Sequence, residues 1–442
     1  MLKIQSKVLW MAVCLLGVMW LLLSQTLGNM ILLIPCLACF LAFVVWAALR
    51  GWAIPILMFF LPFASLLKFK PGMISMYTVA MLAVFLIYAV KGSKNISIKH
   101  FVPALLLIAL TLVVKTLYGY SIDNSYILFS AALLLAPLLQ RELGEKYDFY
   151  WLTMFFAVGI ITAALSARAL IVFPTITQYY IRTHQLVGGI RYAGFYGDPN
   201  FFSAHITAAL GGIFVMLLNK LSKARVIILV VAMSLLVYCG FMSVSKSFFV
   251  VLVALVLFWI IALLFAKEKV TAKVAVLFTL IVGVAFLLLT TAFTDMVGMM
   301  LMRLSGNQSL SALTTGRIDL WLQYLNAFEE DPLLLTFGKG LSDVLVNDRA
   351  AHNTILQSIF QFGLVGSVVM LVWLASYARN LMSGVKIHWH QITQVGILLI
   401  GAIGPWMALD LLFFDEFFLM PIYLCLGISF LTQAEESTEP DI

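Results

Sequence analysis

The sequence predicts an all-α protein, a polytopic transmembrane helical bundle with about 12–14 spans. The chain of 442 residues is 63% hydrophobic and 11% charged, whereas a soluble globular chain is nearer half apolar and a quarter charged. Apolar runs of about 20 residues, the length that crosses a bilayer, recur along nearly the whole chain. These runs are continuously apolar, which argues against the alternating segments of an outer-membrane barrel.

The candidate spans follow one another with mostly short loops between them. They are residues 8–24, 30–48, 52–67, 73–90, 101–118, 126–139, 149–173, 199–218, 226–242, 248–266, 273–293, 353–378, 392–409 and 412–431. Two of them, 52–67 and 126–139, are short enough to be re-entrant. No soluble domain of ordinary size remains between the runs, so residues 1–442 are predicted to form a single polytopic membrane domain.

The N-terminus resembles a signal peptide, with a basic start and an apolar run over 8–23. No A-x-A-like cleavage site follows, so this run is interpreted as an uncleaved first span. The five cysteines all lie inside apolar runs, which indicates packing rather than a disulfide framework.

Lysine and arginine set the predicted orientation. With the N-terminus in the cytoplasm, nearly every short inner loop is basic, in agreement with the positive-inside bias. Both termini are then cytoplasmic, including the acidic tail 433–442. The net charge of +7 reflects these loops at an anionic membrane surface, so no nucleic-acid partner is expected.

Two outer segments, about 174–198 and 294–352, are much longer than the other loops. Long loops are usually functional or disordered, and we expect these two to form the active site. The second contains "TTGRIDLWLQYLNAFEEDP", which predicts an amphipathic helix on the membrane surface. Its predicted apolar face is Ile318, Trp321, Leu322, Leu325 and Phe328.

Basic residues gather in the long outer segments. They are Arg182, His184, Arg191, Arg303, Arg317, Lys339, Arg349 and His352, with Asp198 among them. Each one alone is explained by a solvated loop surface. Together they favour an anion site, because the planar fork of arginine suits phosphate and a diphosphate would engage two or three such groups.

The stretch "RYAGFYGDPNFFSAH" opens the span at 199. Asp198 as N-cap and Pro199 at the first helical position are ordinary helix-start chemistry. That does not explain Arg191 or the nearby glycines, which let backbone approach a ligand. Since helix N-termini favour anions, the stretch, with Asn200, is also interpreted as part of an outward-facing phosphate pocket.

The stretch "AHNTILQSIFQFG" opens another span. Asn353, Gln357 and Gln361 are spaced i, i+4, i+8, a polar stripe that should face protein or water. His352 is either a structural residue of the helix start or a base. A histidine among arginines should stay neutral, because like charges disfavour its protonation, and it could then accept a proton from a hydroxyl.

Lys246 lies in a tight outer turn, "SVSKSFF", as an interfacial anchor or a phosphate ligand. The sequence contains no G-x-x-x-x-G-K-[ST] and no H-E-x-x-H, so no nucleotide, metal or other cofactor is expected. Charges near the middle of the membrane are scarce, which disfavours a proton-coupled transporter.

Five pieces of the second half, in this order, resemble the O-antigen ligase and O-antigen polymerase superfamily of bacterial membrane proteins. They are "RYAGFYGDPNFFSA", the "SKS" turn, "TTGRIDLW", "DPLLLTFGKG" and "AHNTILQSIFQFGLVG". The first half matches only as generic spans. Lys246 departs from the more usual arginine and cannot form a bidentate fork with phosphate.

The resemblance implies a metal-independent glycosyltransferase at the outer face of the cytoplasmic membrane, with an undecaprenyl-diphosphate-linked oligosaccharide as donor. Carried over by residue, Arg191 and Arg317 would bind the diphosphate with help from Lys246, and His352 would activate the acceptor hydroxyl. We place five further residues in substrate binding: Asp198, Asn200, Arg182, Asn353 and Lys339.

The first functional hypothesis is a polymerase that joins lipid-linked repeat units. The alternative is a ligase that moves a glycan onto lipid A-core or another envelope acceptor, and a transporter or flippase of lipid-linked sugars is a third. The expected partners are the lipid-linked oligosaccharide, a glycan or envelope acceptor and the lipid bilayer. A flippase and a chain-length regulator are candidate protein partners.

Overall fold

The computed structural model describes residues 2–92, 98–139, 148–181, 183–186, 189–219, 221–264, 297–299, 301–302, 305, 314, 316–342, 345–382 and 385–436. The elements along the chain are α1 (Leu2–Thr26), α2 (Met30–Arg50), α3 (Ala53–Phe60), η1 (Leu61–Phe63), α4 (Met76–Lys91), η3 (Ile98–His100), α5 (Val102–Leu117), α6 (Asn124–Leu135), η4 (Ala136–Leu138), α8 (Phe149–Ala169), η5 (Leu170–Val172), α9 (Pro174–Thr177), β1 (Thr183–Leu186), β2 (Gly189–Tyr192), α10 (Pro199–Leu217), α11 (Lys223–Met242), α12 (Lys246–Leu264), α16 (Arg317–Glu330), α17 (Pro332–Phe337), α18 (Thr354–Leu381), η6 (Trp389–Gln391), α19 (Ile392–Ala402), η7 (Gly404–Ala408) and α20 (Glu416–Glu436).

The predicted all-α class is confirmed, and the chain is a multi-pass membrane protein. Seven helices among the described residues are long and apolar enough to cross a membrane: Ser6–Leu27, Met30–Arg50, Phe149–Val172, Pro199–Leu217, Lys223–Met242, Lys246–Leu264 and Thr354–Leu381. Six predicted spans correspond to shorter apolar helices: Ala53–Phe63, Met76–Lys91, Val102–Leu117, Asn124–Leu138, Ile392–Ala408 and Glu416–Thr432. The predicted span 273–293 lies outside the described residues.

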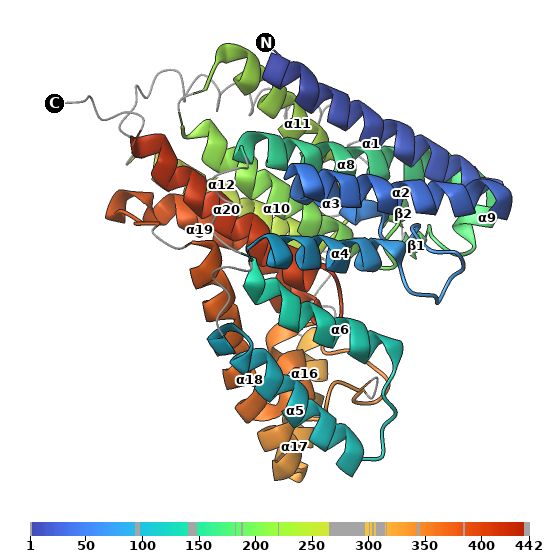
Figure 1. The fold of residues 1–442 in the computed structure, drawn as a ribbon, viewed down its shortest axis with the longest axis vertical. Helices are drawn as coiled ribbons and strands as arrows, with labels where there is room; N and C mark the ends of the chain where they lie inside the picture. The colour runs from blue at the N-terminus through green and yellow to red at the C-terminus, as the bar shows by residue number, and fades with distance from the viewer. Residues whose placement is uncertain are drawn as a thin grey trace.

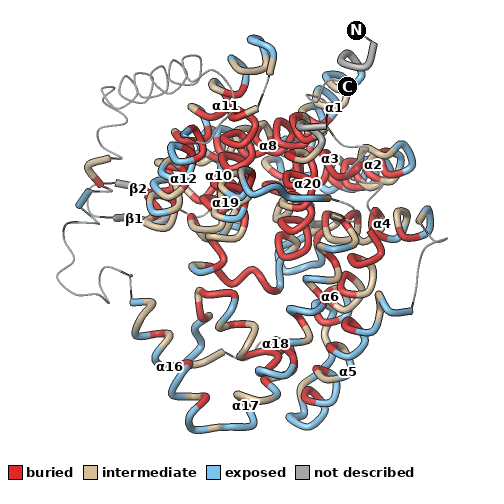
Figure 2. Tube along the Cα trace, turned by 90° about the vertical axis from the view of Figure 1, so that its left-hand side faces the viewer, coloured by how far each residue is buried: buried red, intermediate tan, exposed pale blue. Residues whose placement is uncertain are grey.

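The helices form a larger and a smaller group (Figure 1). In the smaller group, α5 packs on α6 and α18, and α17 packs on α16 and α18. In the larger group, α10 lies at the centre, against α8, α11, α12 and α19. Every residue of α10 from Phe202 to Leu217 is buried, as expected for a helix that is apolar on all sides. Figure 2 shows this burial running through α8, α10, α19 and α20.

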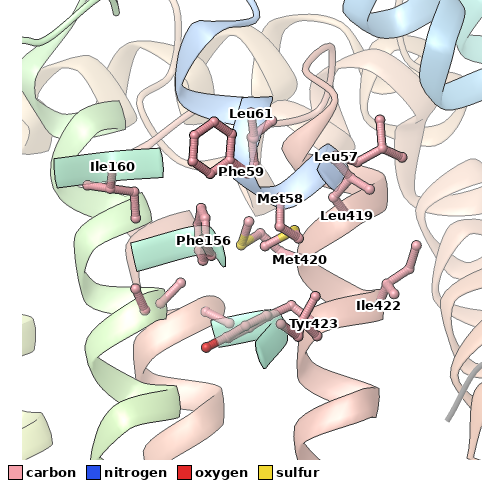
Figure 3. Close-up of a cluster of buried hydrophobic side chains, with 14 of the residues drawn as sticks. Leu57, Met58, Phe59, Leu61, Phe156, Ile160, Leu419, Met420, Ile422 and Tyr423 are labelled. Atoms are coloured by element: carbon pink, nitrogen blue, oxygen red, sulfur yellow. The ribbon is translucent and has the colours of Figure 1, made fainter. Parts of the chain in front are cut away.

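The larger group is held by close packing between distant parts of the chain. Figure 3 shows one such cluster, in which α3, α8 and α20 meet. Phe59 of α3, Phe156 of α8 and Leu419 of α20 are among its fully buried members. Burying each large apolar side chain contributes about 1.5–3 kcal/mol in water. Between helices surrounded by lipid this hydrophobic contribution is absent, and van der Waals packing stabilises the contact instead.

Two glycines hold the smaller group together. The long helix α18 is kinked at Gly363, which has φ +66°. Gly338, with φ +76°, lies directly against this kink. A Cβ at Gly338 would collide with the backbone of Gln361, and one at Gly363 would collide with the backbone of Thr336. Because the end of α17 and the kink of α18 touch through backbone atoms, only glycine fits at either position.

The predicted amphipathic helix exists as α16, but its apolar face is rotated. Leu320, Tyr324 and Phe328 are buried, whereas Leu322 and Leu325 are 52% and 47% exposed. The Tyr324 ring packs edge-on against Phe360 of α18 at 5.0 Å. Its hydroxyl donates to a backbone carbonyl at 2.8 Å, and this partner allows a tyrosine to be buried.

Side chains near the N-terminal ends of α1, α3, α8 and α11 contact one another. The Lys7 ammonium is 3.2 Å from Asp148 and 5.6 Å from the centre of the Trp52 ring. The Arg225 guanidinium lies over Tyr150 at 4.8 Å. These contacts bring the N-terminal ends of α1, α3, α8 and α11 together.

Candidate functional site

The predicted start of α10 at Asp198 is confirmed. The Asp198 carboxylate accepts a hydrogen bond from the backbone N–H of Asn200 at 2.7 Å, and Pro199 is the first helical residue. The Asn200 side-chain oxygen then accepts from the hydroxyls of Ser245 at 2.7 Å and Ser247 at 3.4 Å. The first turn of α10 is therefore joined to the start of α12.

Arg191 and Lys246 meet at the same turn. Residues 174–198 were predicted as a loop, but β1 and β2 form an antiparallel hairpin there, with His184 opposite Arg191. The Arg191 Nε donates to the carbonyl of Ser243 at 3.0 Å. Ser243 ends the last turn of α11, and Lys246 is the first residue of α12. Both cations are partly buried, so neither is a freely solvated surface charge.

Arg317 lies between two carboxylates. It is the first residue of α16, after Gly316 with φ +78°. Burial lowers the pKa of Arg317, while the charges of Asp198 and Asp410 act in the opposite direction. A guanidinium stays protonated in proteins, so Arg317 is a half-buried cation. Its charge interacts with those of Asp198, before α10, and Asp410, between α19 and α20.

His352 has an unusual backbone that Asp410 holds in place. Its φ of +49° lies in the left-handed region, which is uncommon for residues other than glycine. One oxygen of Asp410 accepts from the backbone N–H of His352 at 2.8 Å, and the other accepts from that of Asn353 at 3.2 Å. The two bonds stabilise the turn before α18. Strained residues of this kind cluster at functional sites.

The same carboxylate faces the His352 ring. The Nδ1 atom is 3.5 Å from Asp410 Oδ2, and it is buried although the side chain is 40% exposed. The exposed part of the ring is therefore the other edge, which carries Nε2. Burial raises the pKa of Asp410, while His352, the two backbone N–H groups and Arg317 act in the opposite direction.

The predicted polar stripe on α18 faces protein. Asn353 caps the helix by accepting from the N–H groups of the next turn, and Gln357 and Gln361 are 2% and 0% exposed. Gln361 both accepts from the N–H of Ser342 and donates to its carbonyl, each at 2.9 Å. Asn353 thus adjoins His352, while Gln361 holds the segment after α17.

Two other predicted residues lie apart from this group or outside the described chain. The Lys339 ammonium lies over the ring of Tyr118 at 4.2 Å, and its backbone N–H donates to Phe360. Phe360 is eight residues after His352, about 12 Å along a helix. Lys339 therefore contacts α5 instead of the His352 turn. Arg182 lies outside the described residues.

Asp410 was missed by the sequence reasoning. It is separated from His352 by 58 positions and lies between two apolar runs. Three acidic residues, Asp410, Asp415 and Glu416, interrupt the apolar stretch 392–431. Ionisable residues in such a place are functional candidates by default, and this was the available signal.

Four helices begin around these side chains: α10, α12, α16 and α18. The hydrogen bonds and charges just described connect their first residues. Each helix N-terminus carries a partial positive charge, which favours an anion. Among the described residues, no group of three or more His, Cys, Asp or Glu is placed to hold a metal ion. The arrangement suits a phosphate-bearing ligand beside a histidine base.

A protein-family model covers four of the five sequence pieces, and the first piece, "RYAGFYGDPNFFSA", lies before the matched region. Residues 231–371 match a protein-family model described as O-antigen ligase. The matched region contains Lys246, Arg317 and His352, and it ends before Asp410. No curated protein matches the chain. The predicted resemblance is thereby confirmed.

Proposed function

We propose that the chain, which matches an O-antigen ligase family model over residues 231–371, is a glycosyltransferase that polymerises oligosaccharide repeat units carried on undecaprenyl diphosphate. The reaction takes place at the outer face of the cytoplasmic membrane, with both termini inside, and uses no metal ion. The outer segments 174–198 and 294–352 supply the site, together with the connection between α19 and α20.

The convergence of three cations with four helix N-termini carries this proposal. Arg191, Lys246 and Arg317 adjoin the starts of α10, α12, α16 and α18. A diphosphate that leaves from a sugar gains negative charge in the transition state. Fixed dipoles and cations stabilise such charge without reorganising, and each donor contributes about 10²–10³ in rate.

In the proposed step, a hydroxyl of the acceptor glycan attacks the anomeric carbon of the donor. Its proton passes to His352 Nε2 as the new carbon–oxygen bond forms. The bond between the anomeric carbon and the diphosphate oxygen breaks, and the electron pair leaves with the lipid diphosphate. Asp410 faces Nδ1 at 3.5 Å and stabilises the imidazolium that results.

The same site suits a second function, the transfer of a finished lipid-linked glycan to lipid A-core or another envelope acceptor. The ligase description of the matched family favours it. Both reactions use the donor in the same way, and they differ in the acceptor.

The test uses purified protein in liposomes with an undecaprenyl-diphosphate oligosaccharide, with EDTA present and ATP absent. Products are followed by mass spectrometry. A ladder of longer lipid-linked chains supports the polymerase. Transfer only after an envelope acceptor is added supports the ligase. Unchanged donor with folded protein contradicts both and favours transport, and loss of transfer in EDTA contradicts the metal-free step.

A further inference from the structure

A second histidine lies behind the site, in a chain of three polar side chains. The Tyr196 hydroxyl contacts Nδ1 of His205. On the other side of the ring, Nε2 is 3.0 Å from Glu416 Oε1. Tyr196 comes from the loop after β2, His205 from the second turn of α10 and Glu416 from the start of α20. We call Tyr196, His205 and Glu416 the Tyr–His–Glu chain.

His205 and Glu416 are sealed from solvent, and Tyr196 is partly buried. The side chains of His205 and Glu416 are 2% and 8% exposed. Aromatic rings surround the imidazole, with Tyr196 at 4.8 Å and Phe156 at 5.7 Å. A buried polar group is costly unless it is paired. The tyrosine hydroxyl is the partner of Nδ1, and the carboxylate is the ionic partner of Nε2, although Nε2 makes no hydrogen bond.

The two ends of the Tyr–His–Glu chain are close in sequence to the two halves of the site. Tyr196 lies in the short segment between Arg191 and Asp198. Glu416 follows the connection that contains Asp410, the partner of His352. The hydroxyl of Ser65 also fixes the Tyr196 segment, by donating to the carbonyl before it at 2.7 Å. Movement of either end would shift a charged group of the site.

A direct chemical role for Tyr196 does not fit its surroundings. Burial raises the pKa of this phenol far above its usual range, and the charge of Glu416 adds to the effect. The hydroxyl therefore stays protonated and is a poor nucleophile. Its contact with His205 also turns it inward, toward α20. These observations favour a positioning role.

We propose that Tyr196, His205 and Glu416 are positioning residues that fix Arg191 and Asp198 relative to Asp410. The donor diphosphate and the base His352 belong to different helices, and the Tyr–His–Glu chain connects the segments that carry them. This inference rests on the proposed function for its kinetic consequence. Its structural consequence, an ordered segment 189–200, is independent of the reaction.

The decisive variant is Tyr196→Phe, which removes one hydroxyl and keeps the ring. The matched control is Tyr423→Phe, because Tyr423 is a buried tyrosine whose hydroxyl pairs with Thr153 at 3.0 Å. That pair joins α20 to α8 and does not involve the segment after β2. Glu416→Gln keeps a polar partner for Nε2, and Glu416→Ala removes it, so Gln should retain more function.

Two measurements are made on full-length protein. Hydrogen–deuterium exchange over residues 189–200 should become faster in Tyr196→Phe and Glu416→Ala than in Tyr423→Phe. In the transfer assay, the same variants should raise KM for the donor and lower kcat/KM by about 10–100-fold, because a misplacement near 1 Å costs that much. The order Ala below Gln at position 416 is expected in both.

The outcomes separate the two proposals. Exchange and kcat/KM in Tyr196→Phe equal to those in Tyr423→Phe would overturn the positioning role. If wild-type protein transfers no glycan, the proposed function fails, and the exchange result still decides the positioning role. If Glu416→Ala does not fold, Tyr196→Phe alone decides it.

Discussion

The protein contains two histidine–carboxylate pairs, His352–Asp410 and His205–Glu416, and the two histidine side chains differ mainly in solvent exposure. His352 is 40% exposed and its Nδ1 is 3.5 Å from Asp410, whereas His205 is 2% exposed and 3.0 Å from Glu416. Asp410 lies in the connection between α19 and α20, and Glu416 is the first residue of α20. An exposed imidazole edge can exchange protons with a substrate, and a sealed one cannot. This difference in exposure is the reason why we propose the general base at His352 and a positioning role at His205.

The largest effect is expected at the exposed pair. His352→Asn should lower kcat by about 10²–10⁴, the range for a lost general base. Asparagine tolerates the left-handed backbone at this position better than most residues, so the loss should not come from strain. Transfer kinetics and thermal unfolding are measured together. Near-normal kcat in a folded variant would show that His352 is not the base.

The second largest loss of activity is expected at Arg317, the cation near the His352–Asp410 pair. Arg317→Ala should lower kcat/KM by about 10²–10³, as for the loss of one fixed donor to a developing charge. Arg317→Lys should recover only part, since an ammonium cannot replace a bidentate fork. Lys70→Ala is the control, because Lys70 is an exposed cation outside the proposed site. Equal activity of the Lys variant and the wild type would exclude a bidentate contact.

The third largest loss of activity is expected at Asp410, the carboxylate beside His352. Asp410 uses one oxygen for each of two N–H groups, and an amide offers only one acceptor. Asp410→Asn should therefore lower kcat/KM by about 10–100-fold and destabilise the fold by about 1–3 kcal/mol.

Asp331→Asn is the control for Asp410→Asn. Asp331 also accepts two N–H groups, both at 3.1 Å, but through a single oxygen. An asparagine can repeat that cap, so stability and transfer should change little. Equal losses in the two variants would contradict the two-oxygen explanation.

Local features of the site were predictable from sequence, because they depend on neighbouring residues. The cap at Asp198, the proline after it and the buried stripe that ends at Gln361 all follow from short spacings. Helix positions followed from continuous apolar runs. The family motifs added Arg317 and His352, which local chemistry alone left open.

Features that depend on packing between distant segments were not predictable in this way. The pairs His352–Asp410 and His205–Glu416 join positions far apart in the chain, and nothing in their local sequence names the partner. The apolar face of α16 was assigned by hydrophobicity and left out Tyr324, whose hydroxyl finds a backbone carbonyl that allows its burial. Lys339 was grouped by charge, but the ring of Tyr118 lies beneath it.

The smallest change in activity is expected at Asp415, the carboxylate just before α20. Burial and the charge of Glu416 raise its pKa to about 7, against a hydrogen bond from Thr78 and the charge of Lys68. Between pH 4 and pH 7 the folded protein therefore keeps a proton that the unfolded chain has released. Stability from this group is present below about pH 4 and is lost as the pH rises through about 7.

Asp415→Asn removes this dependence. The Tm of the variant minus that of the wild type should rise between pH 4 and pH 7 and stay constant above about pH 8. Asp348→Asn is the control, since Asp348 is exposed, and its difference from wild type should be flat. Transfer activity should hardly change, because Asp415 faces Thr78 of α4 at 3.0 Å and neither histidine. A large loss of transfer in Asp415→Asn would mean that the whole connection, and not its two histidine partners alone, tunes the site.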